Sequence, residues 1–480
     1  MNFIKIYLFD TLSGKKELVE KPKGRPLRFF ICGPTVYDYS HIGHGRTYVA
    51  FDALGKYLRS TGLEVFYLQN ITNIDDKIIR RAEEEKTDFK TVAKKFTQAH
   101  LRDMKSLGVT AVNKYALATD YIPEIIKQVQ KLIQKKHAYV IEKDGIYFDV
   151  TTFKDYGKLS RRTTLQAEDG ISRIDESVGK RNKADFALWK FSKYEEKRME
   201  NERTLKINNE KPSWPSPFGL GRPGWHIEDT AISEKFFGPQ YEIHGGAVDL
   251  KFPHHEAEIA QQESASGKKP FVKIWLHTGF LTTQGEKMSK SLRNFITIDD
   301  FLKNFSAQVF RLLVLSSHYR SPIDYVQKIG NENQAKWMGI LEFLAKLKLI
   351  IAKTGGEGIG RRNFEEFQAK FSESLADDFN TPKAFGALFT LMAFVNPRIW
   401  KATKSEAKEL YASVSTALKS LGFKIGFPEI PRKIEVLLKE REELRRNQQF
   451  TQSDRLRKKI NDLGFGIEDT PLGPFVWPLR

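Results

Sequence analysis

Cysteine is almost absent from this chain, because Cys32 is the only one among 480 residues. An internal disulfide is therefore excluded, and the scarcity of thiols fits a reducing cytosol. No run of 18 apolar residues occurs, so no membrane-spanning helix is expected. Segment 1–17 has neither a positively charged lead before its apolar part nor a small-residue cleavage site. It predicts a first strand rather than a secretion signal, and the expected location is cytoplasmic, without a membrane.

Positively charged side chains outnumber negatively charged ones in this chain. The chain carries 78 Lys and Arg against 60 Asp and Glu, a formal net charge of +18. Such an excess favours a polyanionic partner such as RNA. The alternative is that it reflects only a lysine-rich proteome. A chain of this length predicts two to four packed units.

A short apolar run at 27–31 is bounded by Pro26 and by Gly33-Pro34, as a buried strand would be. Cys32 then follows the carboxyl end of that strand. Open α/β sheets build their ligand sites at this edge. The only cysteine is therefore a candidate for a binding site.

The turn His41-Ile42-Gly43-His44 precedes a segment with helical spacing at 46–58. Two imidazoles and a glycine are then expected at a helix N-terminus, where backbone N–H groups and the helix dipole favour an anion. Taken alone, His41 is more often a hydrogen-bonded turn histidine than a catalytic residue. The pattern predicts a phosphate site only in combination with further motifs.

Such a motif is Lys287-Met-Ser-Lys-Ser291, which follows a strand-like segment at 272–281 and places two lysines on a loop. Together with the His41–His44 turn, it resembles the signature pair of class I aminoacyl-tRNA synthetases. Four further strings narrow the resemblance to the cysteinyl-tRNA synthetase family, essentially from end to end: Cys32-Gly-Pro-Thr-Val-Tyr37, Asn70-Ile-Thr-Asn-Ile-Asp-Asp-Lys77, Gly224-Trp-His-Ile-Glu228 and Phe252-Pro-His-His-Glu256.

The resemblance implies an α/β fold: a Rossmann-type parallel-sheet catalytic domain split by an insertion, then an all-α helical bundle and a small C-terminal tRNA-binding domain. The expected boundaries are 1–300 for the catalytic domain, 301–425 for the bundle and 426–480 for the anticodon-binding domain. Within the first, the nucleotide-binding halves are expected at about 20–76 and 214–291, with a connective insertion at about 77–213.

Periodicity and turn residues give the expected elements. Strands are expected at 27–31, 65–68, 241–244 and 272–281, with a hairpin at 138–142 and 145–150. Helices are expected at 77–108, 122–136, 254–264, 301–315, 331–353, 377–391, 407–421 and, as a basic pair, 433–462. Segment 161–211 is strongly charged and poor in apolar residues, so a solvated insertion is expected there, with structure resuming at Trp214. Phe475 and Trp477 are expected to close the tail onto the bundle, and the alternative is that they stack on nucleic-acid bases.

The reaction implied by the resemblance joins cysteine to ATP as cysteinyl-adenylate and then transfers the acyl group to the terminal ribose of tRNA(Cys). Negative charge builds on the α-phosphate, so positioning and electrostatics carry the catalysis. The residues implied as catalytic are His41, His44, Lys287 and Lys290, and Lys290 is assigned to direct ATP contact. Arg293 stands where bacterial members commonly have glycine.

The resemblance also implies a Zn²⁺ that binds the substrate thiolate and so rejects serine. Its ligands map to Cys32, Asp229, His254 and Glu258. His254 and Glu258 are spaced i, i+4, so they share one face of a helix. Asp229 departs from the family, which has cysteine there. An aspartate keeps the negative charge but is a harder ligand, and the alternative is that zinc is lost and Asp229 only forms hydrogen bonds.

By the same resemblance, Gly33, Thr72 and Trp225 would contact the cysteine substrate. Gly246 and Asp249 would hold the ribose of ATP, which is bound with Mg²⁺. The expected protein is a monomer. Two alternatives share the catalytic half: a ligase that joins cysteine to an amino sugar, as in mycothiol synthesis, and a non-catalytic RNA-binding paralogue.

Overall fold

The computed structural model describes residues 4–162, 179–192, 194–196, 205–207, 212–288, 294–353 and 356–479. The chain divides into two units. The first comprises Met1–Asn304, Tyr319–Asp324 and Ala376–Phe379, and the second comprises Phe305–His318, Tyr325–Leu375 and Asn380–Arg480. None of the helices within the described ranges combines the length and apolar character that a membrane crossing requires.

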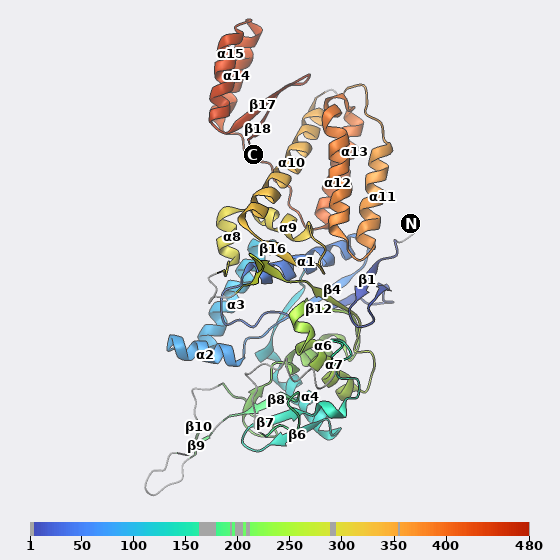
Figure 1. Ribbon diagram of the computed structural model, residues 1–480, viewed down its shortest axis with the longest axis vertical. Helices are drawn as coiled ribbons and strands as arrows, with labels where there is room; N and C mark the ends of the chain where they lie inside the picture. The colour runs from blue at the N-terminus through green and yellow to red at the C-terminus, as the bar shows by residue number, and fades with distance from the viewer. Residues whose placement is uncertain are drawn as a thin grey trace. The chain divides into compact units, whose positions relative to one another are not determined.

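A five-stranded parallel sheet forms the centre of the first unit, in the order β13-β12-β3-β4-β5 (Figure 1). Its strands are β3 (Leu27–Ile31), β4 (Val65–Ile71), β5 (Lys114–Leu117), β12 (Tyr241–Ala247) and β13 (Val272–Thr278). The strands expected at 27–31, 65–68 and 241–244 are thus confirmed, two of them extended by three residues at their carboxyl ends. Their side chains are almost all buried, as expected for a parallel sheet covered on both faces.

Helices connect the parallel strands, as right-handed crossovers require. They are α1 (Ile42–Ser60), α2 (Asp76–Glu85), α3 (Phe89–Ser106), α6 (Ile227–Phe237) and α7 (His254–Ser266). The single helix expected at 77–108 is in fact two, because Lys86 adopts a left-handed conformation with φ 51° and Asp88 caps a new helix. Within the sheet β3 lies between β4 and β12, so the two halves of the sequence meet at the β3–β12 pair.

An antiparallel sheet in the order β11-β8-β7-β6 lies between the halves in sequence. It follows α4 (Ile122–Gln134) and contains β6 (Ala138–Ile141), β7 (Gly145–Phe148), β8 (Phe186–Phe191) and β11 (Gly221–Pro223). The hairpin at 138–150 is confirmed. The solvated insertion expected at 161–211 is wrong in part, because Leu188 and Trp189 of β8 are fully buried. The high charge of the surrounding segment hid this short apolar strand.

The remaining elements of this unit are short. They are β1 (Tyr7–Asp10), β2 (Lys15–Leu18), η1 (Ala118–Tyr121), η2 (Val150–Thr152), β9 (Tyr194–Glu196), β10 (Leu205–Ile207), η4 (Val248–Lys251), β14 (Leu281–Thr283), β15 (Glu286–Lys287) and α8 (Ile298–Asn304). The strand expected at 272–281 therefore ends at Thr278. β16 (Ile323–Tyr325) spans the boundary between the units.

The second unit is helical. It contains α9 (Ala307–Leu315), α10 (Gln327–Ala352), α11 (Arg362–Ala376, all but its last residue), α12 (Thr381–Val395), η5 (Asn396–Lys401), α13 (Lys404–Ser420), α14 (Arg432–Arg446) and α15 (Phe450–Asp462), followed by the hairpin of β17 (Phe465–Thr470) and β18 (Gly473–Pro478). Phe475 and Trp477 are buried, and the Phe475 ring lies 6.1 Å from that of Trp400. Closure of the tail onto the bundle is confirmed.

Two helix predictions in this region are wrong in detail. The helix expected at 301–315 is interrupted before Ser306, which caps α9 through its hydroxyl. The helix expected at 377–391 begins later, at Thr381, because Asp378 and Phe379 have positive φ angles of 60° and 47° and Asn380 caps the new helix. Helix α11 was not anticipated, although its buried phenylalanines recur with helical spacing at 364, 367 and 371.

An ion-pair cluster around the buried Glu242 holds the two halves of the sheet together. Glu242 of β12 accepts hydrogen bonds from the guanidinium groups of Arg25 and Arg28 at 2.8–3.0 Å, and from the backbone N–H of Arg28 at 3.1 Å. Burial alone would raise the pKa of Glu242, but these charged donors lower it to about 2. The cluster therefore ties β12 to β3 with the carboxylate ionised.

Replacing Glu242 with Gln should destabilise the first unit in a pH-dependent way. Because the folded pKa lies near 2 and the unfolded value near 4.5, the carboxylate contributes its full stabilisation above pH 4.5 and loses it as the pH falls towards 2. We expect a loss of about 2–3 kcal/mol at pH 7 that disappears near pH 2, measured by urea unfolding. Asp155→Asn, which breaks the exposed pair with Lys269, is the control and should cost less than about 1 kcal/mol. An equal effect of both substitutions would contradict the assignment.

Candidate functional site

The carboxyl ends of β3 and β4 approach each other closely. A Cβ atom on Gly33 would lie 1.7 Å from the backbone oxygen of Asn70, so only glycine fits there. The backbone N–H of Gly33 donates to Asn70 Oδ1 at 2.6 Å, and Cys32 N–H donates to the Gly245 carbonyl of β12 at 3.0 Å. The cysteine is thereby fixed where the two halves of the sheet meet, which is where open α/β sheets bind ligands.

Cys32, Asp229, His254 and Glu258 form one buried cluster, and one potential ligand atom from each lies within 4.8 Å of all the others. His254 Nε2 is 3.1 Å from Asp229 Oδ2 and 3.0 Å from Glu258 Oε1, and Cys32 Sγ is 3.6 Å from Glu258 Oε1. The structure thus brings together all four residues predicted as metal ligands, one just after β3, one on α6 and two on α7. A thiol, an imidazole and two carboxylates at this spacing match the donor types of a zinc site.

The electrostatics of the cluster favour a positive charge. Burial, followed by the nearby carboxylates of Glu258 and Asp229, raises the pKa of the Cys32 thiol well above its ordinary value. Burial alone would lower the pKa of His254, yet the same two carboxylates raise it to about 10. Buried acidic groups therefore surround one point, and they favour either a proton on His254 or a metal cation. The residues fit a divalent metal.

A second set, which sequence reasoning did not identify as ligands, shares two of these residues. Cys32 Sγ lies 3.2 Å from both His244 Nε2 and His255 Nε2, and these histidines with Cys32 and Glu258 also satisfy the spacing of a metal site. Their other ring nitrogens are engaged, that of His244 by the Tyr241 hydroxyl at 2.6 Å and that of His255 by His277 at 2.8 Å. The sequence feature that could have pointed to this second set is the clustering of histidines around the sequence motifs.

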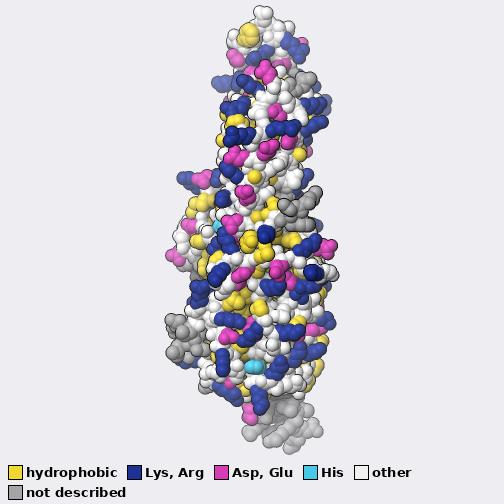
Figure 2. Space-filling model, turned by 90° about the vertical axis from the view of Figure 1, so that its right-hand side faces the viewer, with side chains coloured by type: hydrophobic (Ala, Val, Ile, Leu, Met, Phe, Trp, Pro, Cys, Tyr) yellow, Lys and Arg dark blue, Asp and Glu magenta, His cyan; other side chains and the backbone are white. Residues whose placement is uncertain are grey.

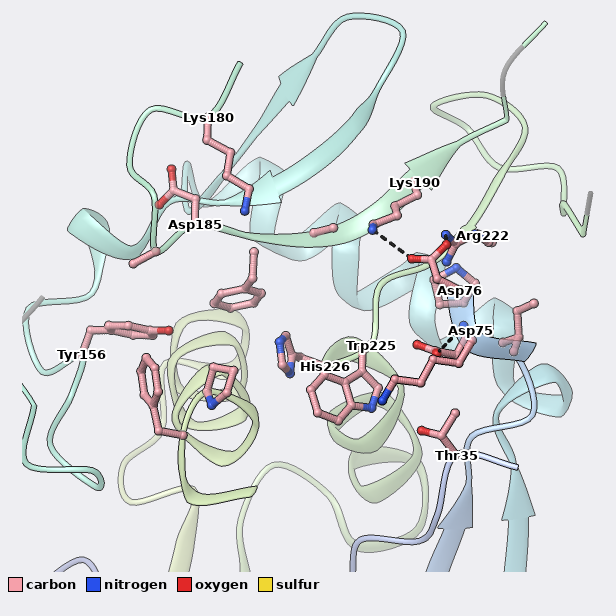
Figure 3. A pocket seen from close by; sticks show the side chains of 18 residues that line it. Thr35, Asp75, Asp76, Tyr156, Lys180, Asp185, Lys190, Arg222, Trp225 and His226 are labelled. Carbon is pink, nitrogen blue, oxygen red and sulfur yellow. Dashed lines mark hydrogen bonds and ion pairs between the residues drawn. The ribbon is translucent and has the colours of Figure 1, made fainter. Parts of the chain in front are cut away.

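The two possible sets of metal ligands differ in their position relative to a cavity of about 300 Å³. Trp225 and His226 line it (Figure 3), and His254 stacks on the Trp225 ring with centroids 4.6 Å apart. His244 instead stacks on Trp275, at 4.4 Å. The Asp229–His254 side of the cluster is therefore the side next to the cavity, from which a small substrate can reach it.

The opposite wall of the cavity comes from the antiparallel sheet and the start of α2. Asp76 forms ion pairs with Lys190 of β8, at 3.3 Å, and with Arg222 of β11 (Figure 3). Asp75 caps α2 by accepting from the Lys77 backbone N–H. The inserted sheet and the start of α2 thus contribute charged groups to the cavity.

Two buried polar neighbours of the cluster, Asn70 and Glu228, were not predicted as site residues, whereas Thr72 was. The hydroxyl of Thr72 donates to Glu228, and the amide nitrogen of Asn70 donates to Asp229 Oδ1. Burial, followed by the adjacent Asp229, raises the pKa of Glu228 well above its ordinary value. Because its own proton goes to Glu228, the Thr72 hydroxyl is left as an acceptor. No local pattern marks these contacts, which join residues more than 150 positions apart.

The His41–His44 turn begins α1 as predicted. His41 Nδ1 accepts from the Gly43 N–H at 3.0 Å, and His44 Nδ1 accepts from the His41 N–H at 3.3 Å, so the two residues form a capping box. Both Nε2 atoms then carry the ring proton and are donors. Burial lowers the pKa of His44 to about 4. It is therefore neutral at pH 7 and acts as a hydrogen-bond donor.

The loop that contains Lys287 and Lys290 has both of its flanks beside this turn. Lys290 and Arg293 lie outside the described residues, and of Lys287 only the backbone, in β15, is described. On the near side, the buried Met288 places its methyl group 3.0 Å from where a Cβ of Gly43 would be. On the far side, Ile42 N–H donates to the Ile296 carbonyl at 3.0 Å. The structure thus brings both flanks of the loop to the start of α1.

The two residues predicted to hold a ribose follow the same edge of the sheet. Gly246 is buried near the end of β12, where a Cβ would lie 2.9 Å from the His255 ring. Asp249 lies just beyond the strand, in η4, and is exposed. They are well placed next to β3, but their role remains a prediction.

Comparison with known proteins identifies the family of the chain. Residues 18–335 match the family model described as tRNA synthetases class I (C) catalytic domain, and residues 370–427 match the DALR domain. The chain is 40% identical over 492 aligned positions to the cysteine–tRNA ligase of Thermococcus onnurineus, and 39% identical over 482 to that of Coxiella burnetii. Each alignment covers 98% of both chains.

Solved structures with the same fold are much more distant in sequence. The ternary complex of Agrobacterium radiobacter agnB2 LeuRS with tRNA and LeuAMS has a TM-score of 0.62 at 10% identity, covering 84% of each chain. Methionyl-tRNA synthetase from Mycobacterium tuberculosis, with methionyl-adenylate, has a TM-score of 0.56 at 13% identity and covers 82% of this chain and 89% of its own. These structures support the fold alone.

Proposed function

The chain belongs to the cysteine–tRNA ligase family of class I tRNA synthetases, and on this premise we propose that it activates cysteine with ATP and transfers it to the 3′ end of tRNA(Cys). The observation that carries the proposal is the buried cluster of Cys32, Asp229, His254 and Glu258 beside a cavity at the carboxyl edge of the sheet. The nearby start of α1 supplies a separate site for phosphate. One edge of the sheet thus offers both halves of an adenylating site.

ATP, with its Mg²⁺, is proposed to bind between the start of α1 and the end of β12. The Nε2–H groups of His41 and His44 would donate to phosphate oxygens, and Asp249 beyond Gly246 would accept from ribose hydroxyls. Lys287 and Lys290 would add positive charge as the loop closes on the α-phosphate. Donors fixed where negative charge develops lower the barrier without any protein nucleophile.

Cysteine is proposed to bind in the cavity between Trp225 and the end of β3. The Thr72 hydroxyl, whose own proton is given to Glu228, can accept from the substrate ammonium. Gly33, which the Asn70 backbone approaches closely, would contact the substrate through its own backbone. Cys32, Asp229, His254 and Glu258 would hold Zn²⁺, which when bound supplies a soft contact for the substrate thiolate that the hydroxyl of serine cannot match.

The wider assignment follows the same premise. We propose that residues 1–300 form the catalytic domain, with nucleotide-binding halves at about 20–76 and 214–291 and a connective insertion at about 77–213. Residues 301–425 would form the helical bundle and 426–480 the anticodon-binding domain. Basic side chains are scattered among acidic ones over the face in Figure 2, a distribution suited to many dispersed phosphate contacts. A cytoplasmic monomer is the proposed state.

Replacing Lys290 with Ala should abolish most adenylate formation while leaving the fold intact. Loss of one electrostatic donor costs about 10²–10³-fold in rate. The measurement is cysteine-dependent ATP–pyrophosphate exchange, with Lys273→Ala, at an exposed lysine paired with Glu20, as the control. Exchange within threefold of wild type would remove Lys290 from this role, and no exchange in the wild type would overturn the function itself.

Asp229 should tolerate cysteine but not alanine. Asp229→Cys restores a softer ligand, so we expect it to keep activity and bind zinc more tightly. Asp229→Ala should lose the metal and weaken cysteine binding. Zinc content and the relative activation of cysteine and serine would be measured for all three proteins. A wild type that carries no zinc after zinc-supplemented preparation, yet activates cysteine efficiently, would contradict the metal site.

Asn70 should matter for metal binding only while residue 229 is an aspartate. Its amide holds Asp229 Oδ1, which leaves Oδ2 directed at His254. Partners that orient a ligand contribute about 10- to 100-fold in metal affinity. We expect Asn70→Ser to weaken zinc binding by about this factor in the wild type, but much less in Asp229→Cys, because a thiolate has no second oxygen to hold. Equal losses in both backgrounds, at equal thermal stability, would show that Asn70 only supports the fold.

A further inference from the structure

A second hollow, of about 510 Å³, lies at the carboxyl edge of β4 and β5. Asn73, which follows Thr72, forms one part of its lining together with Thr119, which follows β5. The two side chains bond each other: Asn73 Nδ2 donates to Thr119 Oγ1 at 2.8 Å, and the Thr119 N–H donates to Asn73 Oδ1 at 3.0 Å. Helix α3 forms another wall, so we call this hollow the α3 cleft.

The other lining side chains combine aromatic rings with positive charge. Phe89 and Trp214 are half-buried and meet edge to face, with centroids 6.5 Å apart and an interplanar angle of 76°. Lys90 and Lys94 are exposed one turn apart on α3. Among the described residues no ion pair involves either of them, whereas the neighbouring Lys95 pairs with Glu85 at 3.2 Å.

This combination is typical of sites for unpaired nucleotides. Aromatic rings stack on bases of any sequence, and lysines along one wall contact the phosphates between them. A purely apolar peptide would leave both lysines unused, and a duplex does not expose base faces for stacking. The chemistry of the α3 cleft therefore favours single-stranded nucleic acid.

The order of the sheet indicates which nucleotides these are. Along the edge, the proposed ATP site lies at β12 and β3, the cysteine site at β3 and β4, and the α3 cleft at β4 and β5. Transfer requires a terminal ribose to reach the activated cysteine. ATP occupies one side of that point, so the RNA strand must approach from the other side, where the cleft lies one residue beyond Thr72.

We propose that the α3 cleft binds the unpaired 3′-terminal nucleotides of the tRNA, with a base on Phe89 and Trp214 and phosphates on Lys90 and Lys94. The proposal rests on the proposed function and adds a subsite to it. It requires that these side chains contribute to the binding and transfer of tRNA, and not to the activation of cysteine.

The test compares intact tRNA with tRNA trimmed of its unpaired 3′ nucleotides. Wild type should bind the intact form more tightly. Lys90→Glu/Lys94→Glu should remove most of this preference, lower the charging rate and reduce the salt dependence of binding intact tRNA by about two phosphate contacts. Trp214→Leu should weaken the binding of intact tRNA by about 5- to 100-fold. Affinity for trimmed tRNA and cysteine-dependent pyrophosphate exchange should stay within twofold of wild type.

The matched control is Arg102→Glu/Lys105→Glu, the same charge change at exposed positions further along α3. It should retain the preference for intact tRNA. If the Lys90/Lys94 variant keeps the full preference, or loses affinity for intact and trimmed tRNA alike, the cleft does not hold the 3′ end. A wild type that neither binds nor charges tRNA would instead overturn the proposed function.

Discussion

The pairing of β3 with β12 is the constraint on which the site depends. These strands come from opposite sides of an insertion of more than 100 residues, and Glu242 with Arg25 and Arg28 ties them at one end. At the other end the same pairing sets Cys32 against Gly245 and brings His244 to 3.2 Å from the thiol. A register shift of one residue would turn Cys32 to the opposite face of the sheet. The ligand set therefore exists only in this register.

Burial then determines the chemistry of the groups that the sheet brings together. His44 and His277 are buried away from acids, and burial lowers their pKa values to about 4 and about 3. His254 is equally buried, yet Glu258 and Asp229 raise its pKa to about 10. The fold thus keeps these two histidines neutral at pH 7 and places the acidic groups around His254, where they favour a cation.

The sequence predicted those parts of the site that depend on local spacing. His254 and Glu258 are one helical turn apart, and the histidine turn at the start of α1 needs only its neighbours for its cap. Local spacing could not predict contacts between distant segments, such as that of Asn70 with Asp229 or that of Thr72 with Glu228. Strand β8 was not predicted because the segment around it is strongly charged. The predicted start of α12 was wrong because Asp378 and Phe379 adopt positive φ angles, which no sequence pattern indicates.

The proposed role of Asp229 as a metal ligand departs from the cysteine of the family, and the surroundings of this aspartate suit that role. A thiolate presents a single atom to a metal, whereas a carboxylate presents two oxygens and can rotate between them. Here the side-chain amide nitrogen of Asn70 donates a hydrogen bond to Asp229 Oδ1. The amide oxygen of the same side chain, Oδ1, accepts from the backbone N–H of Gly33, next to Cys32. The carboxylate therefore offers one oxygen in a fixed direction, as a thiolate would. The same amide links residue 229 to the backbone beside Cys32, so the hydrogen-bond network restricts the carboxylate as a proposed metal ligand would require.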